Sequence, residues 1–174
     1  FALETDAAPL AEPGVVEALV DHGFERLFVV VGGARAKIHE TVMADPGGFA
    51  AAMTGLRRAT ESGIAAYVVM PVLEWTRQDV MPLLEALLAR EPRIKGFLLS
   101  LPEMRQVPRA AHRVLLPYAA QAKLAERVFD ACRRAGVEYG FTLRRGILPC
   151  AADGALLLTY HGLNDLRLQR RVSR

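Results

Sequence analysis

The fold is decided by the stretch LFVVVGGARAKIHETVMADPGGFAAAMTGLRRATESGIAAYVVMP, residues 27–71. It opens with a β-branched and aromatic run, Leu27–Val31, of the kind found in strands that are buried on both faces. The glycine pair Gly32-Gly33 ends that run. Asp45 and Pro46 then predict a helix start, because aspartate accepts hydrogen bonds from free amides and proline loses no bond at the first helical position.

A helical stripe follows this start, and a second strand closes the unit. Phe49, Met53, Leu56 and Thr60 recur at helical spacing, and Ile64–Leu73 is again an apolar run. A strand, a helix and a strand, with uniformly apolar strands, form the repeating unit of a parallel sheet.

The same alternation continues on both sides of this unit. The expected strands are Phe1–Thr5, Ile94–Leu101, Val137–Leu143 and Ala155–Tyr160, and the expected helices run from Glu12-Pro13 to Gly23, from Thr76 to near Pro92, and over Ala119–Ala135. Thr76 with Asp79 three residues later predicts a capping box. The sequence therefore predicts an α/β fold with about five to six parallel strands and outer helices, either an open doubly wound sheet or part of a (β/α) barrel.

Length and charge predict one domain. The 174 residues are expected to form a partial barrel over 1–150 and a C-terminal strand with a basic tail over 151–174. No apolar run approaches the roughly 18 residues of a membrane helix, so we expect a soluble chain. The net charge is +3. The tail arginines, Arg167, Arg170, Arg171 and Arg174, form either a frayed basic end or a contact for nucleic acid or an acidic partner. We do not expect nucleic acid as a partner, because aromatic and basic residues do not interleave.

The cysteines indicate a reducing compartment. Cys132 and Cys150 are too few for a disulfide framework and wrongly spaced for zinc, so we predict a cytoplasmic location. The alanine and arginine bias suggests a GC-rich bacterial genome. The chain begins at Phe1 in a strand-like run, and we therefore expect it to be a piece of a longer protein.

Chemistry in parallel α/β folds collects at the carboxyl ends of the strands. In this sequence those ends carry Glu4-Thr5-Asp6, Gly32-Gly33, Met70-Pro71 with Glu74, Ser100 with Glu103, and Thr142 with Arg144-Arg145. The glycine pair either forms an anion-binding turn or is simply a tight turn between strand and helix. Glu4 and Asp6 either contact a ribose or an amine, or cap the turn that follows.

Three further side chains are weaker candidates. His39 and His112 could serve acid–base chemistry or metal binding, but neither has a partner at ligand spacing, and a solvated or hydrogen-bonding role is the plainer interpretation. Cys150 could be a ligand or a reactive thiol, although a small buried side chain is the simpler interpretation. No serine lies in a nucleophile elbow, so the pattern does not favour a hydrolase triad.

The order of these motifs resembles the radical S-adenosylmethionine (SAM) enzyme superfamily. ALETDAAPL resembles the strand end that reads TNG in these enzymes, and FVVVGG takes the place of their next strand. IHETVMADPGGFAAAMTGLRRATESGI, YVVMPVLEWTRQDVMPLLEALL and ILPCA follow in the family's order. The resemblance covers residues 1–150 and implies the C-terminal part of a TIM-type barrel, with Gly32-Gly33 ending a strand and His39 in the segment that connects it to the next helix.

Two family motifs are missing from this sequence. The C-x-x-x-C-x-x-C loop, which holds the [4Fe-4S] cluster, and the GGE motif, which binds the SAM amino group, do not occur. Cys132 and Cys150 cannot supply three closely spaced thiolates. The cluster would have to come from an N-terminal segment. By the resemblance, the SAM side of the pocket would involve Thr5, Asp6, Gly32, Gly33, Met70 and Pro71, and no catalytic or metal-binding residue is assigned.

These observations leave three functional hypotheses. The first is the SAM-side and substrate-side portion of an iron–sulfur oxidoreductase or maturase, inactive alone. It would need an N-terminal half-barrel or a homo-oligomer to cover strand edges and a set of barrel-facing apolar residues: Phe1, Leu3, Val29, Val31, Tyr67, Val69, Phe97 and Leu99. The second is a cluster-free binding module that recognises a peptide or protein through the loop Pro102–Pro117 and the basic tail. The third is a small complete enzyme with a metal or sugar site at Glu4, Asp6 and Glu74.

Overall fold

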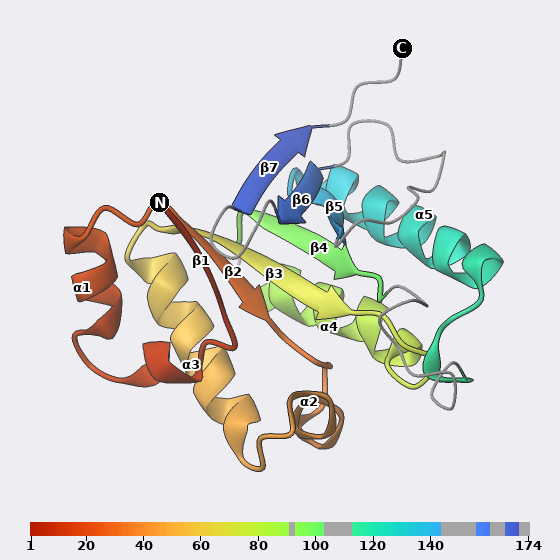
Figure 1. Ribbon diagram of the computed structural model, residues 1–174, viewed down its shortest axis with the longest axis horizontal. Coiled ribbons are helices and arrows are strands. Elements are labelled where there is room, and N and C mark those ends of the chain that lie inside the picture. Colours follow the sequence, from red (N-terminus) through yellow and green to blue (C-terminus); the bar gives the residue numbers. More distant parts are fainter. Residues whose placement is uncertain (91–92, 103–112, 144–155, 161–165, 171–174) are drawn as a thin grey trace.

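The chain forms one sheet of seven strands, which lie in the sheet in the order of the sequence (Figure 1). The computed structural model describes residues 1–90, 93–102, 113–143, 156–160 and 166–170. The strands are β1 (Ala2–Thr5), β2 (Arg26–Val30), β3 (Ala65–Pro71), β4 (Gly96–Ser100), β5 (Glu138–Leu143), β6 (Leu156–Tyr160) and β7 (Leu166–Arg170). The helices are η1 (Ala8–Ala11), α1 (Val15–Asp21), α2 (Ala36–Met43), α3 (Gly48–Glu61), α4 (Arg77–Arg90) and α5 (Tyr118–Ala135).

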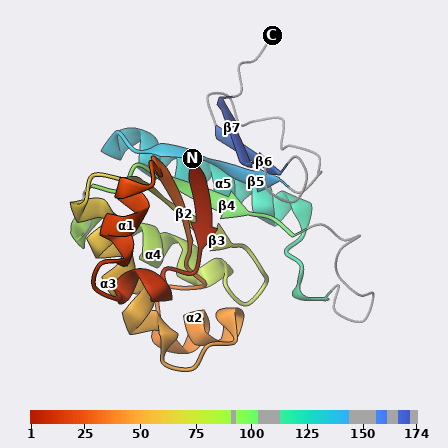
Figure 2. The same cartoon turned by 60° about the vertical axis from the view of Figure 1, so that its left-hand side comes forward.

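The predicted α/β fold is confirmed. Strands β1 to β6 pair in parallel, and β7 pairs antiparallel with β6. Helices α3, α4 and α5 pack their apolar stripes on one face of the sheet, where Leu56, Leu84 and Val128 join one continuous core (Figure 2). Sequential strand order with these helices on one face is the arrangement of a partial barrel, because a doubly wound sheet reverses its strand order and carries helices on both faces.

The two faces of the sheet hold separate apolar clusters. Val29, Val31, Phe97 and Leu99 lie in the helix-side core, whereas the opposite face, which we call the inner face, carries Phe28, Tyr67, Val69 and Leu98. The prediction that these side chains face the barrel interior was therefore right for Tyr67 and Val69. It was wrong for Val29, Val31, Phe97 and Leu99. Leu3 also packs on the helix side, and Phe1 precedes β1 and is 82% exposed. Both faces are apolar, so hydrophobicity gives no signal about which alternate residues face which way.

A side-chain bridge crosses the amino-terminal end of the inner face. Tyr67 on β3 and Glu138 on β5 are both in register with Gly96 on the strand between them. The Tyr67 hydroxyl donates to Glu138 Oε2 at 2.8 Å, and the Tyr67 ring stacks on Phe28 with centroids 5.1 Å apart. A Cβ on Gly96 would lie 2.6 Å from Tyr67 Cδ1. Glycine is required there because the ring must pass over β4.

Helix α2 was not predicted from the sequence. Residues 36–43 were expected in a connecting segment, but they form two helical turns just past the end of β2 (Figure 1). The expected cap at Asp45 is wrong as well. Helix α3 begins at Gly48 behind Gly47, which has φ 84°, and no side chain caps it. The Asp45 carboxylate instead lies where a Cβ on Gly48 would be.

The predicted start of α4 is correct, but its capping box does not form. The Thr76 hydroxyl accepts from the Leu73 amide and donates to the Pro71 carbonyl, both at 2.8 Å. The Asp79 carboxylate bonds to an arginine elsewhere in the chain. Part of the predicted basic tail is a strand, β7. Among the described residues, no helix is both long and apolar enough to span a bilayer.

Candidate functional site

The predicted site residues lie along the carboxyl-terminal edge of the sheet. Thr5 is the last residue of β1 and pairs with Val29. The Val31 amide donates to the Val69 carbonyl at 2.9 Å, which places Gly32-Gly33 just beyond the end of β2 and beside the end of β3. Pro71 is level with Ser100 on β4. The sequence thus predicted the location of these residues, and their role as cofactor ligands stays a prediction.

The strand end at Thr5 and Asp6 is tied into a local turn. The Thr5 hydroxyl oxygen accepts from the Ala7 amide at 3.1 Å, and Asp6 Oδ1 accepts from the Ala8 amide at 3.2 Å. Of the two interpretations of Asp6, turn capping is therefore realised. Asp6 is exposed, and its second carboxylate oxygen has no hydrogen-bond partner in the described part of the chain. That oxygen is available to a donor from outside.

The turn after Asp6 is held against α3 by another glycine. A Cβ on Gly55 would collide with the Ala7 carbonyl oxygen and would lie 2.9 Å from Leu10 Cβ. Helix η1 therefore packs directly on the backbone of α3. Through this contact, α3 holds in place the turn at Ala7, which follows Asp6.

The glycine pair is a packing surface for α2. A Cβ on Gly32 would lie 2.8 Å from Val42 Cβ, and one on Gly33 would lie 2.6 Å from Ile38 Cγ2. The Gly32 amide donates to His39 Nδ1 at 3.1 Å. The Gly32 amide therefore already has a partner inside the chain and is not available to an anion. Close packing in a tight turn explains why both positions are glycine.

His39 is buried in α2 and joins that helix to the end of β2. Its residue exposure is 1%, and its ring lies 5.3 Å from the Phe49 ring. Nδ1 accepts the Gly32 amide proton, so the neutral ring carries its own proton on Nε2. Burial lowers the pKa of His39, and Glu40, Asp45 and Asp6 oppose that shift. The predicted hydrogen-bonding role is thus found at this buried histidine.

Met70 and Pro71 face opposite sides of the sheet. Met70 is fully buried in the helix-side core, so its side chain is turned away from the inner face. Pro71 is half-buried on the inner face, and its carbonyl accepts from the Thr76 hydroxyl. Only the backbone of Met70 remains for contact with a ligand on the inner face.

Two hydroxyl side chains extend the Pro71 row across the edge. Ser100 pairs with Pro71 on one side and with Thr142 on the other. Their chain neighbours Leu99 and Phe141 lie in the helix-side core, so Ser100 and Thr142 face inward. Thr142 is 5% exposed. In the part of the chain that the structure describes, neither hydroxyl makes a hydrogen bond, and a buried hydroxyl without a partner is uncommon.

An ion pair that was not predicted from the sequence joins the start of α2 to the start of α4 at this edge. Arg35, just before α2, donates to Asp79 Oδ1 from Nη2 at 2.6 Å and from Nε at 3.0 Å. The Asp79 side chain is 4% exposed and lies in the first turn of α4. The hydrogen bond and the charge of Asp79 raise the pKa of Arg35. No local pattern signals this contact, because 44 positions separate the two residues.

Metal-binding groups do not gather in the described residues. There, no three histidine, cysteine or acidic side chains are placed to hold a metal ion. Glu74 pairs with Arg77 at 3.1 Å, so the proposed metal site at Glu4, Asp6 and Glu74 is not formed there. Cys132 belongs to α5 and is buried in the core, where desolvation raises the pKa of its thiol to about 12. The remaining candidates, His112, Glu103, Arg144-Arg145 and Cys150, lie outside the described residues, as does most of the loop Pro102–Pro117.

Comparisons with known proteins agree with this architecture. No family model and no curated protein matches the chain. Among solved structures, it is similar to a domain of pyruvate-formate lyase-activating enzyme from Bacteroides vulgatus, with a TM-score of 0.58 and 18% sequence identity. The match covers 80% of this chain and 79% of that one. At this identity the likeness concerns the fold. The chain is an α/β protein that shares the fold of this domain, a partial barrel of parallel strands with helices on one face.

Proposed function

We propose that this chain is the SAM-side and substrate-side portion of a radical-SAM-type iron–sulfur oxidoreductase or maturase. The observation that carries the proposal is the set of unengaged polar groups at the carboxyl edge of the partial barrel. These are the outer oxygen of Asp6 at the end of β1, and the hydroxyls of Ser100 and Thr142 on β4 and β5. By the resemblance, the β1 end would lie on the SAM side, and β4 and β5 would line the substrate.

The residues of this chain do not fit the iron–sulfur cluster. A cluster that leaves one iron open needs three closely spaced thiolates, whereas the sequence has two cysteines and Cys132 lies in the apolar core. No step is therefore assigned through a cluster. The chain would bind and orient, and a cluster-bearing N-terminal half-barrel would supply the redox chemistry.

Strand β1 offers a place for that half-barrel. Among the described strands it is the first in the sheet order, and there its one neighbour is β2. An edge strand presents a row of backbone groups that a further strand can pair with. A second copy of this chain is the other candidate. Sedimentation velocity over a concentration series distinguishes the two, because only self-association depends on the concentration of this chain alone.

The SAM-side assignment is tested by binding of S-adenosylhomocysteine, which keeps the adenosine and amino acid parts of SAM. We expect calorimetry to detect binding to the wild-type chain and a several-fold loss in Asp6→Asn. Asparagine preserves the Oδ1 acceptor for the Ala8 amide and replaces the outer oxygen with a donor. Asp21→Asn, an equal charge change on α1, is the matched control. Absence of binding to the wild type, or equal binding by both variants, refutes the assignment.

The substrate-side assignment is tested by Thr142→Val, which removes a hydroxyl without changing side-chain shape. A buried hydroxyl without a partner costs about 1–3 kcal/mol, so we expect the valine variant to unfold at higher urea concentration. Thr60→Val is the matched control, because Thr60 is also 5% exposed but its hydroxyl donates to the Arg57 carbonyl at 2.8 Å. That variant should lose stability. A loss of stability in Thr142→Val would show that its hydroxyl is already satisfied and would refute the assignment.

A second function, a cluster-free module that binds a protein or peptide, is favoured by a groove on the outer surface rather than by the loop and tail named from the sequence.

A further inference from the structure

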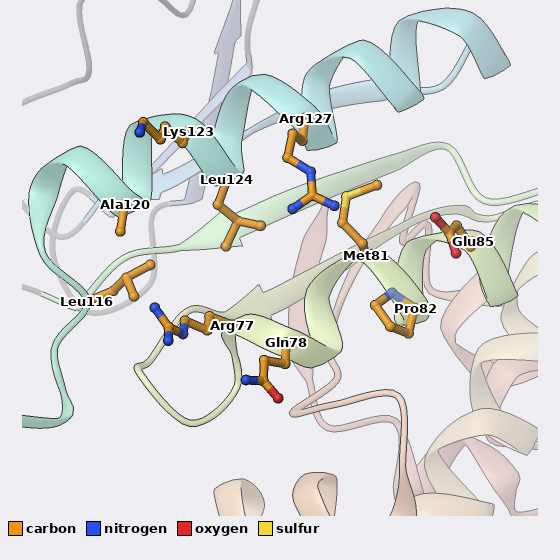
Figure 3. A pocket seen from close by; sticks show the side chains of 10 residues that line it. All are labelled: Arg77, Gln78, Met81, Pro82, Glu85, Leu116, Ala120, Lys123, Leu124 and Arg127. Carbon is orange, nitrogen blue, oxygen red and sulfur yellow. The ribbon is translucent and has the colours of Figure 1, made fainter.

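A groove of about 600 Å³ runs between α4 and α5 on the outer surface of the partial barrel (Figure 3). Its apolar part is formed by Met81, Leu116 and Leu124. Its cations come from both helices, with Arg77 on α4 and with Lys123 and Arg127 on α5. The groove is therefore an apolar trough with positive charge on both sides.

These cations are available to a partner. In the described part of the chain, Lys123 and Arg127 form no ion pair. Arg77 pairs with Glu74, but both side chains are about half exposed, and such pairs contribute little and exchange readily. Lys123 and Arg127 are four residues apart, so they lie one above the other on the same side of α5. Glu85, at the far end, is the acidic residue of the lining.

An exposed aromatic residue lies at the start of each of the two helices, α4 and α5. Trp75 precedes α4 and is 47% exposed, and Tyr118 opens α5 and is 54% exposed. The Glu74 amide donates to the Val114 carbonyl at 2.8 Å, which ties the two segments together at this end of the groove. Neither ring lines the groove, but Trp75 is two residues from Arg77 and Tyr118 is two residues from Leu116, which do. Exposed aromatic residues are typical anchors of protein interfaces.

We propose that the groove between α4 and α5 is a docking surface for an acidic amphipathic helix of a partner protein. From Arg77 to Glu85 the groove follows α4 for about 12 Å, which matches roughly two turns of a docked helix. The apolar face of that helix would lie on Met81 and Leu124. Two carboxylates four residues apart would meet Lys123 and Arg127. This inference does not depend on the cofactor proposal.

The test uses a fluorescein-labelled amphipathic peptide of four helical turns, with leucines on one face and glutamates four residues apart along its border. We expect saturable binding by fluorescence anisotropy, weakened at least about tenfold when the glutamates are replaced by glutamine. The double variant Lys123→Glu/Arg127→Glu should lose binding to the same extent and should instead bind a peptide with lysines at those positions. Affinity for the wild type should fall as salt rises.

The matched control is Lys37→Glu/Arg134→Glu, which makes the same charge change at two exposed residues outside the groove. It should bind the glutamate peptide within twofold of the wild type. Equal binding by both double variants would show nonspecific charge attraction and overturn the proposal. Absence of peptide binding would also overturn it, as would saturable binding of inorganic phosphate that Lys123→Glu/Arg127→Glu abolishes, because the groove would then be a small-anion site.

Discussion

Gly96→Ala is expected to destabilise the partial barrel through a single side chain, Tyr67. The new Cβ would lie 2.6 Å from Tyr67 Cδ1 and 3.1 Å from the Glu138 carbonyl oxygen. The ring cannot swing away freely, because its hydroxyl is bonded to Glu138 and its face is stacked on Phe28. Overpacking of this kind costs about 1–3 kcal/mol, and the backbone gain of alanine over glycine in a strand offsets about 0.5–1 kcal/mol. We expect a net loss of about 1 kcal/mol in the free energy of unfolding.

A double-mutant cycle isolates this contact. In a Tyr67→Val background the ring atoms are gone, so Gly96→Ala should be neutral or stabilising by up to about 1 kcal/mol. In a Tyr67→Phe background the ring remains, and Gly96→Ala should still destabilise. Urea unfolding followed by far-ultraviolet circular dichroism gives all of these values. If Gly96→Ala costs the same with valine at position 67 as in the wild type, the steric reasoning is refuted.

Three further predictions concern buried ionisable groups. Asp79→Asn should lower stability and speed amide hydrogen exchange in α2, because Arg35 loses its charge partner. Asp130→Asn breaks an exposed ion pair and should change stability by less than about 0.5 kcal/mol. Equal effects of the two variants would show that the Arg35–Asp79 pair does not stabilise this edge. Burial lowers the pKa of His39, so the unfolded state binds more protons just below the ordinary value of 6.5 and stability should fall as pH drops through that range. A neutral His39→Gln variant should lose this part of the slope in pH-dependent unfolding, and His22→Gln, on an exposed residue, should keep it. Cys132, whose thiol pKa is raised to about 12 by burial, should resist iodoacetamide at pH 8 in the native chain and react in urea, as peptide mass spectrometry will report.

The order of β1 to β6 was predictable because each of these strands is a short apolar run set off by breakers. Gly136 is an example, since it takes a left-handed conformation and ends α5 where the pattern indicated. Strand β7 reads LRLQR and was expected as part of the basic tail. Helix α2 was not predictable on the same grounds. It has eight residues and no local start signal. Its position depends on packing against Gly32 and Gly33 and on the hydrogen bond from the Gly32 amide to its own buried residue His39. Isolated helices of this length are marginal, and tertiary packing decides whether they form.

The candidate site was predictable in its location and not in its side-chain detail. Parallel strands end at one edge, so Thr5, Gly32 and Pro71 were expected there and are found there. Which groups remain available to a ligand depends on partners distant in sequence. The Gly32 amide is taken by His39, and Asp79 is taken by Arg35 across 44 positions.

The unengaged polar groups at this edge fall into two separate places. Asp6 follows β1, whereas Ser100 and Thr142 end β4 and β5. Four interstrand steps of about 4.8 Å separate β1 from β5, or about 19 Å along the sheet. A single side-chain-sized contact cannot serve both places, so the proposed function requires that the edge bind two ligands or two distant parts of one ligand. For this reason Asp6→Asn and Thr142→Val should affect different binding events. If S-adenosylhomocysteine affinity fell equally in both variants, the division of the edge into a SAM side and a substrate side would be wrong.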